Sequence, residues 1–336
     1  MTILVTGGAG YIGSHMVHEL NDAGESVVVL DNLSTGFRFL VPGKVPFVVG
    51  STGDRALVAD VIARHRVTAI IHFAASIVVP DSIADPLRYY SNNTMNTCVV
   101  LDAAVKAGVR QFIFSSTAAV YGNAETVPVP ETAPTVPISP YGTSKLMSEI
   151  MLHDAGKAHG LRIVVLRYFN VAGADPRLRT GQSTPQATHL IKVACEAALG
   201  KRAKLDVFGT DYPTPDGTCI RDYIHVSDLA RAHSAALAHL RGGGLSSTFN
   251  CGYGRGASVL EVIAAVKRIS GVDFAVEIGG RRAGDPPTLV ADVSRIRARL
   301  DWQPQFEDLD SIVRHAFAWE RRLPGRRADV VTAPAG

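Results

Sequence analysis

A tyrosine and a lysine stand four residues apart, at Tyr141 and Lys145 in the run YGTSK. On a helix, this spacing places both side chains on the same face. A nearby ammonium favours the phenolate, so we expect Lys145 to lower the pKa of Tyr141. An unperturbed tyrosine, with a pKa of about 10, is a poor base at neutral pH. The pair therefore predicts a tyrosine that takes and returns a hydroxyl proton near neutral pH.

A glycine pattern opens the chain, with Gly7, Gly10 and Gly13 between an expected strand and an expected helix. This context is typical of a nucleotide cofactor loop, because glycines let the main chain approach a pyrophosphate at a helix N-terminus. Asp31 ends the next expected strand, where a carboxylate accepts bonds from a ribose diol and repels a 2′-phosphate. These features predict NAD rather than NADP.

The first half of the chain alternates apolar runs with amphipathic stretches. The runs are apolar on both faces, as strands covered by helices on both sides must be. We therefore predict an α/β, Rossmann-like fold with a doubly wound parallel sheet. The expected strands are residues 2–6, 26–30, 46–49, 69–73, 111–116 and 162–166, and the expected helices are 11–23, 55–66, 92–107 and 139–159.

After residue 170 the sequence becomes rich in loops. A loop is expected over 171–188 and an irregular stretch over 205–221. We predict an NAD-binding domain over residues 1–170 and a smaller, loop-rich α/β substrate domain over 171–325, with some segments that return to the first sheet. Residues 326–336 are expected to form a flexible tail. Further elements are expected at 189–200, 226–240 and 258–270 as helices and at 247–251 as a strand.

The bulk composition excludes several classes of protein. A formal net charge of +3 over 336 residues gives no reason to expect a nucleic-acid surface. Four scattered cysteines form no CxxC pair, which favours a reducing compartment and no metal site. No run of about 18 apolar residues indicates a membrane span. With the first strand expected to begin at Thr2, no leader is expected, and we predict a cytoplasmic enzyme.

Longer motifs cover the chain from Thr6 to Pro287. They are TGGAGYIGSH (6–15), LDNLSTG (30–36), IHFAAS (71–76), FIFSSTAAVYG (112–122), SPYGTSKL (139–146), LRYFNVAGA (166–174), DYPTPDGTCIRDYIHVSDLA (211–230) and RRAGDPP (281–287). With these motifs the chain resembles the UDP-glucose 4-epimerases of the extended short-chain dehydrogenase/reductase family.

The resemblance implies reversible 4-epimerisation of a UDP-hexose with tightly bound NAD. Tyr141 removes the proton of the sugar 4-hydroxyl while hydride passes from C4 to NAD. The 4-keto sugar then turns over in the pocket and receives hydride on its other face. Lys145 is the implied partner of the base, and Thr117 the implied hydroxyl on the sugar 4-oxygen. A homodimer is also implied, formed by helices around residues 92–107 and 144–155.

The resemblance also assigns binding residues by position. Around the cofactor it places, besides the glycines, Asp31, Tyr141 and Lys145, the residues Tyr11, Ile12, Asn32, Ser51, Phe73, Ala74, Ala75, Asn92 and Tyr168. Two arginines suit the diphosphate, because a guanidinium grips phosphate in bidentate fashion. Around the UDP-sugar it places Arg221, Arg282, Asp285 on the uridine ribose, Asn170, His189, Leu190, Phe208 and Tyr223, besides Thr117 and Tyr141.

Four positions depart from the family pattern. Ser51 replaces an aspartate that often meets the adenine, and Ile77 replaces a lysine near the cofactor phosphates, so the grip on NAD is expected to be weaker. His189 stands where an asparagine often contacts the substrate. Leu289 occupies the position that admits or excludes N-acetylated sugars, and its intermediate size predicts some activity on UDP-N-acetylglucosamine.

Alternative functions are weighed on the same residues. A 4,6-dehydratase needs an acid after the threonine, and Ala118 and Ala119 follow Thr117 instead. A non-catalytic NAD-binding protein tends to lose the tyrosine, which this chain keeps. A UDP-pentose or UDP-uronate 4-epimerase, or a UDP-glucuronate decarboxylase, shares the Tyr/Lys pair and stays open.

Overall fold

Seven parallel strands form the central sheet of the computed structural model, which describes residues 1–185, 187–282 and 284–332. The strands lie in the order β11-β6-β5-β4-β1-β2-β3, and this order reverses its direction at β1 and β4. The predicted doubly wound parallel sheet is confirmed. The strands are β1 (Thr2–Thr6), β2 (Ser26–Asp31), β3 (Phe47–Val49), β4 (Val67–His72), β5 (Gln111–Thr117), β6 (Arg162–Tyr168) and β11 (Ser247–Cys251).

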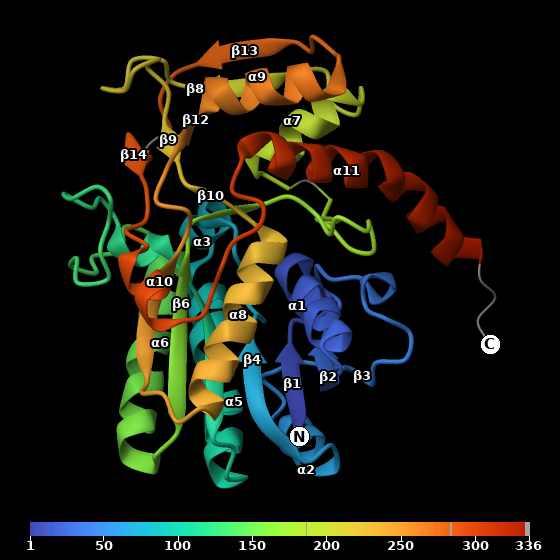
Figure 1. Cartoon of the computed structure of the whole chain (residues 1–336), viewed down its shortest axis with the longest axis vertical. Helices are drawn as coiled ribbons and strands as arrows, with labels where there is room; N and C mark the ends of the chain where they lie inside the picture. The colour runs from blue at the N-terminus through green and yellow to red at the C-terminus, as the bar shows by residue number, and fades with distance from the viewer. Residues whose placement is uncertain (186, 283, 333–336) are drawn as a thin grey trace.

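Helices cover both faces of this sheet (Figure 1). Successive side chains of β1 enter different cores, with Ile3 and Val5 in one cluster and Leu4 in the other. This alternation is the reason that the strand sequences are apolar throughout. One face carries α1 (Tyr11–Asp22) and α8 (Val226–Arg241), and the other carries α2 (Arg55–Arg64), α5 (Asn96–Lys106) and α6 (Pro140–His159).

The second half of the chain builds a smaller layer beyond the carboxyl ends of the strands (Figure 1). Its helices α7 (Leu190–Ala198), α9 (Val259–Ser270) and α11 (Leu309–Thr332) pack against one another. Because β11 pairs with β6, the two halves share the central sheet. The small sheets join β7 (Asn170–Ala172) with β10 (Tyr223–His225), β8 (Leu205–Phe208) with β13 (Val276–Gly279), and β9 (Ile220–Arg221) with β12 (Ala257–Ser258) and β14 (Thr288–Leu289).

Some elements differ from the expectation. The helix expected over 92–107 is divided, because the π-helix Tyr90–Met95 precedes α5. In that turn the Asn93 side chain donates to the Ser76 carbonyl at 2.9 Å and to the Ser144 hydroxyl at 3.0 Å, contacts that local sequence does not reveal. The stretch 205–221, expected to be irregular, contains β8 and β9, which pair with strands far along the chain.

Other elements were not expected. They are the helices α3 (Val79–Ala84), α4 (Pro86–Tyr89), α10 (Ser294–Arg299) and α11, the 3₁₀ turns Arg38–Leu40 and Ala118–Tyr121, and the strands β7, β10, β12, β13 and β14. Residues 326–332 of the expected tail continue α11, and residues 333–336 lie outside the described residues. Across the described residues, no helix is both long and apolar enough to cross a membrane.

The start of α6 is fixed by its sequence. Ser139 caps the helix, since its hydroxyl accepts from the amide of Gly142 at 3.2 Å, and Pro140 occupies the first helical position. Gly160 ends the helix in the left-handed conformation, at φ 68°. The cap places Tyr141 in the first turn, at the carboxyl end of the sheet.

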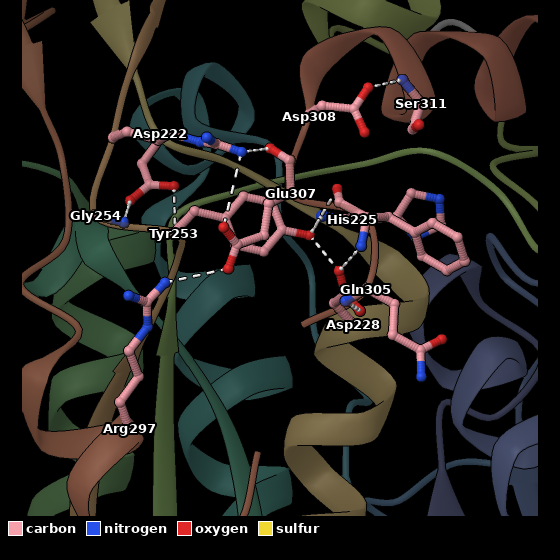
Figure 2. A network of polar contacts seen from close by, with 12 residues as sticks. Asp222, His225, Asp228, Tyr253, Gly254, Arg297, Gln305, Glu307, Asp308 and Ser311 are labelled. Atoms are coloured by element: carbon pink, nitrogen blue, oxygen red, sulfur yellow. Dashed lines mark hydrogen bonds and ion pairs between the residues drawn. The ribbon is translucent and has the colours of Figure 1, made fainter. Parts of the chain in front are cut away.

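A buried polar network ties the start of α8 to the segment before α11 (Figure 2). The Asp228 carboxylate accepts from the main-chain amides of Gln305 at 2.8 Å and Phe306 at 2.9 Å. The Tyr253 hydroxyl donates to the same carboxylate at 2.5 Å. Two remote segments are thereby held against one helix terminus.

The same network fixes the strand region that carries two predicted substrate residues. Asp222 lies between Arg221 and Tyr223, and its carboxylate accepts from the amides of Tyr253 at 2.8 Å and Gly254 at 3.0 Å (Figure 2). Burial raises the pKa of Asp222 to about 6, although these amide bonds oppose the shift. These bonds fix the main chain at Asp222, and with it the neighbouring residues Arg221 and Tyr223, against the segment at Tyr253 and Gly254.

Candidate active site

Tyr141 and Thr117 meet where α6 begins and β5 ends. Burial raises the pKa of Tyr141 to about 12, and a hydrogen bond to the Thr117 side chain opposes that rise. The Thr117 hydroxyl also accepts from the amide of Ala119 at 3.1 Å, which fixes it at the strand end. The ring of Tyr89 stands edge-on to that of Tyr141, with centroids 6.5 Å apart.

Lys145 lies one turn further along α6 and is buried. Its Nζ donates to the carbonyl of Ser115 at 2.9 Å and lies 4.9 Å from the centroid of the Phe114 ring. Burial lowers the pKa of Lys145 to about 7, and the charge of Glu149 opposes the shift. The expected lowering of the Tyr141 pKa is wrong for the protein alone, because burial outweighs the other influences on the phenol.

The glycine loop is packed too tightly for side chains. A Cβ on Gly7, which has φ +69°, would lie 2.7 Å from the nitrogen of Ala74 in the loop after β4. A Cβ on Gly13 would lie 2.1 Å from the carbonyl oxygen of Gly7. Gly10 stands at the N-cap of α1, where no side chain caps the helix. An uncapped helix N-terminus at the end of the central strand fits the pyrophosphate of a dinucleotide.

Asp31 adjoins the loop at the end of β2. Its carboxylate accepts from the amides of Ala9 at 2.9 Å and Leu33 at 2.8 Å, and its burial raises its pKa. Each carboxylate oxygen has a second lone pair, so a ribose hydroxyl fits as a further donor. The neighbouring Asn32 is exposed and accepts from the amide of Ser34 at 3.0 Å.

These features are matched in known proteins. The family described as "NAD dependent epimerase/dehydratase family" matches residues 3–252. The chain belongs to this family. The UDP-glucose 4-epimerase of Azospirillum brasilense is 61% identical over 96% of this chain and 92% of its own length.

Two solved structures show the same likeness. The UDP-glucose 4-epimerase of Brucella ovis, in complex with NAD, has a TM-score of 0.92 and 45% identity, over 94% of this chain and 97% of that one. The UDP-Glc/GlcNAc 4-epimerase of Campylobacter jejuni has a TM-score of 0.85 and 50% identity, over 96% and 99%. The predicted resemblance, the prediction of an epimerase and the prediction of NAD as cofactor are confirmed.

Three further residues predicted to bind the cofactor, Tyr11, Phe73 and Tyr168, lie just after β1, just after β4 and at the end of β6. The Tyr11 hydroxyl donates to the carbonyl of Gly173 at 2.7 Å. The ring of Phe73 lies 4.8 Å from that of His233, which also bonds the Tyr168 hydroxyl at 2.8 Å. These contacts draw three of the predicted residues into the core around α1, β4 and β6.

Other residues near the predicted cofactor site are half-buried or exposed to solvent. Asn92, in the π-helix, donates to the Ser76 hydroxyl at 3.0 Å. Ser51 is exposed after β3, and its hydroxyl accepts from the amide of Gly53 at 3.1 Å. Ile77 is 52% exposed. Ile12, Ala74 and Ala75, three further members of the predicted set, are half-buried.

One pocket brings together four of the predicted substrate residues. It lies between β7, β10 and the start of α7, and Asn170, His189, Leu190 and Tyr223 all line it. Gln182 lines it too, although sequence reasoning did not select that residue. Gln182 belongs to a loop without periodicity, so no local signal marks it.

Besides Thr117 and Tyr141, the remaining predicted substrate residues form a cluster near β9, made of Arg221, Arg282, Asp285 and Phe208. Asp285 accepts from Arg282 in bidentate fashion, at 3.0 Å for each bond, and lies 3.6 Å from the Arg221 guanidinium. The Arg282 guanidinium also stacks over the ring of Phe208, 5.5 Å from its centroid. In the protein alone, both arginines expected at the diphosphate are therefore partnered by Asp285. Leu289 is half-buried and pairs with Arg221 across β14 and β9.

Proposed function

We propose that the chain interconverts UDP-glucose and UDP-galactose by transient oxidation at C4. One observation carries the proposal. Tyr141 at the start of α6 and Thr117 at the end of β5 lie at the same sheet edge as the glycine loop, in a chain 61% identical to a UDP-glucose 4-epimerase. A 4-hydroxyl held by both side chains would have its proton acceptor and its orienting hydroxyl in place.

Tyr141 is assigned the proton. As phenolate it takes the proton of the 4-hydroxyl, and as phenol it returns that proton when the 4-keto sugar is reduced. Thr117 holds the 4-oxygen in either configuration. NAD, held by the glycine loop and Asp31, would supply the hydride acceptor and donor at C4, so no net redox change would result. Lys145 is assigned two roles: it binds the cofactor ribose, and its ammonium places a positive charge near Tyr141.

The binding residues are assigned from the family pattern, and their positions in the fold support that assignment. The glycine loop and Asp31 suit the pyrophosphate and the adenosine ribose. Arg221 and Arg282 are assigned to the diphosphate of the substrate, and Asp285 to the uridine ribose. Asp285 contacts both arginines, so the three side chains form one cluster that suits a diphosphate beside a ribose.

UDP-N-acetylglucosamine is a second candidate substrate. The half-buried Leu289 is intermediate between a bulky and a small residue, and the Campylobacter jejuni relative is titled a UDP-Glc/GlcNAc 4-epimerase. A turnover assay with UDP-N-acetylglucosamine tests this candidate. No turnover beside robust conversion of UDP-galactose would exclude it.

The assembly and location are also proposed. Large apolar side chains are exposed on α6 and next to α5, including Met95, Met147 and Ile150, and they support a homodimer formed by these helices. All four cysteines are free, which suits the cytoplasm. Light scattering of the purified protein tests the dimer, and a monomer at micromolar concentration would contradict it.

The proposed reaction is tested by adding UDP-galactose to the purified protein without added NAD. Anomeric signals of UDP-glucose that grow to a fixed ratio would support 4-epimerisation by a retained cofactor. If activity requires added NAD, the loose grip expected at Ser51 is the first explanation. If UDP-galactose is not converted with or without added NAD, while UDP-xylose or UDP-glucuronate is turned over, a pentose or uronate substrate would be favoured instead.

A further inference from the structure

The side chain of a buried glutamine, Gln182, contacts the ring of His189. The side-chain nitrogen of Gln182 lies 2.8 Å from Nδ1 of the ring. An amide NH₂ group only donates, so Nδ1 accepts and carries no proton. A neutral imidazole with a bare Nδ1 carries its proton on Nε2. Burial lowers the pKa of His189, which keeps the ring neutral at physiological pH.

The pair lies in the pocket of the predicted substrate residues. Gln182 and His189 line it together with Asn170 and Tyr223. Lys192 is the cation that shares the lining, and it pairs with Glu196 at 3.2 Å and also with Glu320. The charge of Lys192 is therefore balanced by the two glutamates. The neutral N–H of His189 is then a donor that the pocket can offer to a ligand.

We propose that Gln182 is a positioning residue that holds His189 with its proton on Nε2, as a donor to an oxygen of the bound nucleoside diphosphate. The inference rests on the proposed function, because it takes a UDP-sugar as the ligand of this pocket. The residue at position 182 therefore determines whether Nε2 of His189 donates or accepts a hydrogen bond.

The proton position is measured directly by long-range ¹H–¹⁵N correlation on ¹⁵N-histidine-labelled protein saturated with UDP. The His189 signals are identified by their loss in His189→Gln. The expected pattern is that of the Nε2–H form. A proton on Nδ1, or on both nitrogens at pH 8, would overturn the proposal.

A second test reverses the bond. In Gln182→Glu the carboxylate only accepts, so Nδ1 carries the proton and the neutral ring presents a bare Nε2 to the phosphate. We expect the dissociation constant of UDP to rise about tenfold at pH 8.5. At lower pH the introduced carboxylate favours the imidazolium, whose Nε2–H again donates, so the difference from the unaltered protein is expected to shrink. Unchanged UDP affinity at pH 8.5 with a reversed tautomer would overturn the proposal.

Two matched variants separate tautomer from charge. Gln182→Met keeps the length but imposes no tautomer, and its smaller loss of affinity is expected not to vary with pH. In Gln182→Glu combined with His189→Gln, the pH-dependent loss of UDP affinity is expected to disappear, since no imidazole remains whose tautomer can change. Persistence of that loss would assign it to the carboxylate and overturn the proposal. All of these tests measure UDP binding, so failure of UDP-galactose turnover would not be mistaken for their failure.

Discussion

The ammonium of Lys145 donates to the main-chain carbonyl of Ser115 at 2.9 Å, two residues before Thr117 on the same strand. Burial brings the pKa of Lys145 to about 7 and that of Tyr141 to about 12. The protein alone therefore favours a neutral phenol. A bound oxidised nicotinamide is positively charged and would favour the phenolate, so the proposed base would be coupled to its cofactor.

Tyr141→Phe removes the proposed base and leaves the ring. The turnover of UDP-galactose is expected to fall roughly 10²–10⁴-fold, the usual contribution of a general base. The fold and the NAD content are expected to persist, because the ring still packs against Tyr89. Steady-state kinetics and the absorbance of released cofactor check both. Undiminished turnover would remove Tyr141 from its assigned role.

Thr117 offers a graded test of the orienting hydroxyl. Thr117→Ser keeps the hydroxyl and should stay within a few-fold of the original rate. Thr117→Val keeps the shape and loses the bond, so a loss of about 10- to 100-fold is expected. Since that bond lowers the pKa of Tyr141, its loss should also move the rising limb of the pH–rate profile to higher pH. Equal rates and profiles for the two variants would contradict the role.

The fold of the first half was predictable because its signals are local. Apolar runs and glycines at strand ends mark each strand and loop, as in β1 and the loop at Gly7. The second half was less predictable, since β8 pairs with β13 about seventy residues later, and β9 with β14 at a similar separation. Such pairing depends on the tertiary fold rather than on a local pattern.

The site divides in the same way. The contact of Tyr141 with Thr117 joins two motif residues, and sequence reasoning selected both. The bond from Gln182 to His189 depends on a loop conformation that no periodicity encodes. The opposing shifts of Tyr141 and Lys145 depend on burial, which a motif does not report.

Gly13→Ala tests the cofactor loop. The new Cβ would lie 2.1 Å from the Gly7 carbonyl, so the loop must move away from the position that fits a pyrophosphate. We expect the purified variant to retain less than about a tenth of the NAD, because a shift of the loop removes main-chain donors from phosphate. Gly43→Ala is the control, since a Cβ there meets open space. Equal NAD content in both variants would contradict the assignment.

Two adjacent arginines provide a matched pair at the proposed diphosphate site. Arg282 bonds Asp285, whereas Arg281 bonds Asp211 at 2.7 Å and lies over the ring of Tyr212. Arg282→Ala is expected to raise the KM for UDP-galactose about tenfold or more and to change kcat little, as loss of uniform binding does. Arg281→Ala should leave KM within about twofold, since it removes an exposed ion pair and a ring contact with Tyr212 that lie outside the Arg221–Arg282–Asp285 cluster. The reverse ranking would place the diphosphate elsewhere.

Buried histidines predict a loss of stability on mild acidification. Burial lowers the pKa of His233 and of His15 to about 4, and that of His72 to about 3. The unfolded chain takes up these protons below about pH 6.5, and the folded chain does not. The stabilisation is therefore complete above pH 6.5 and falls by about 2 kcal/mol per histidine between pH 6.5 and pH 5.

His233→Gln isolates one of these contributions. His233 Nδ1 lies 2.8 Å from the Leu229 carbonyl and so carries the proton, while Nε2 accepts from the Tyr168 hydroxyl. Glutamine does not titrate, so the fall in unfolding free energy from pH 6.5 to pH 5 should be about 2 kcal/mol smaller than in the unaltered protein. Urea denaturation at the two pH values measures it, with the exposed His159→Gln as control. The same pH dependence in both variants would mean that His233 does not resist protonation in the folded state.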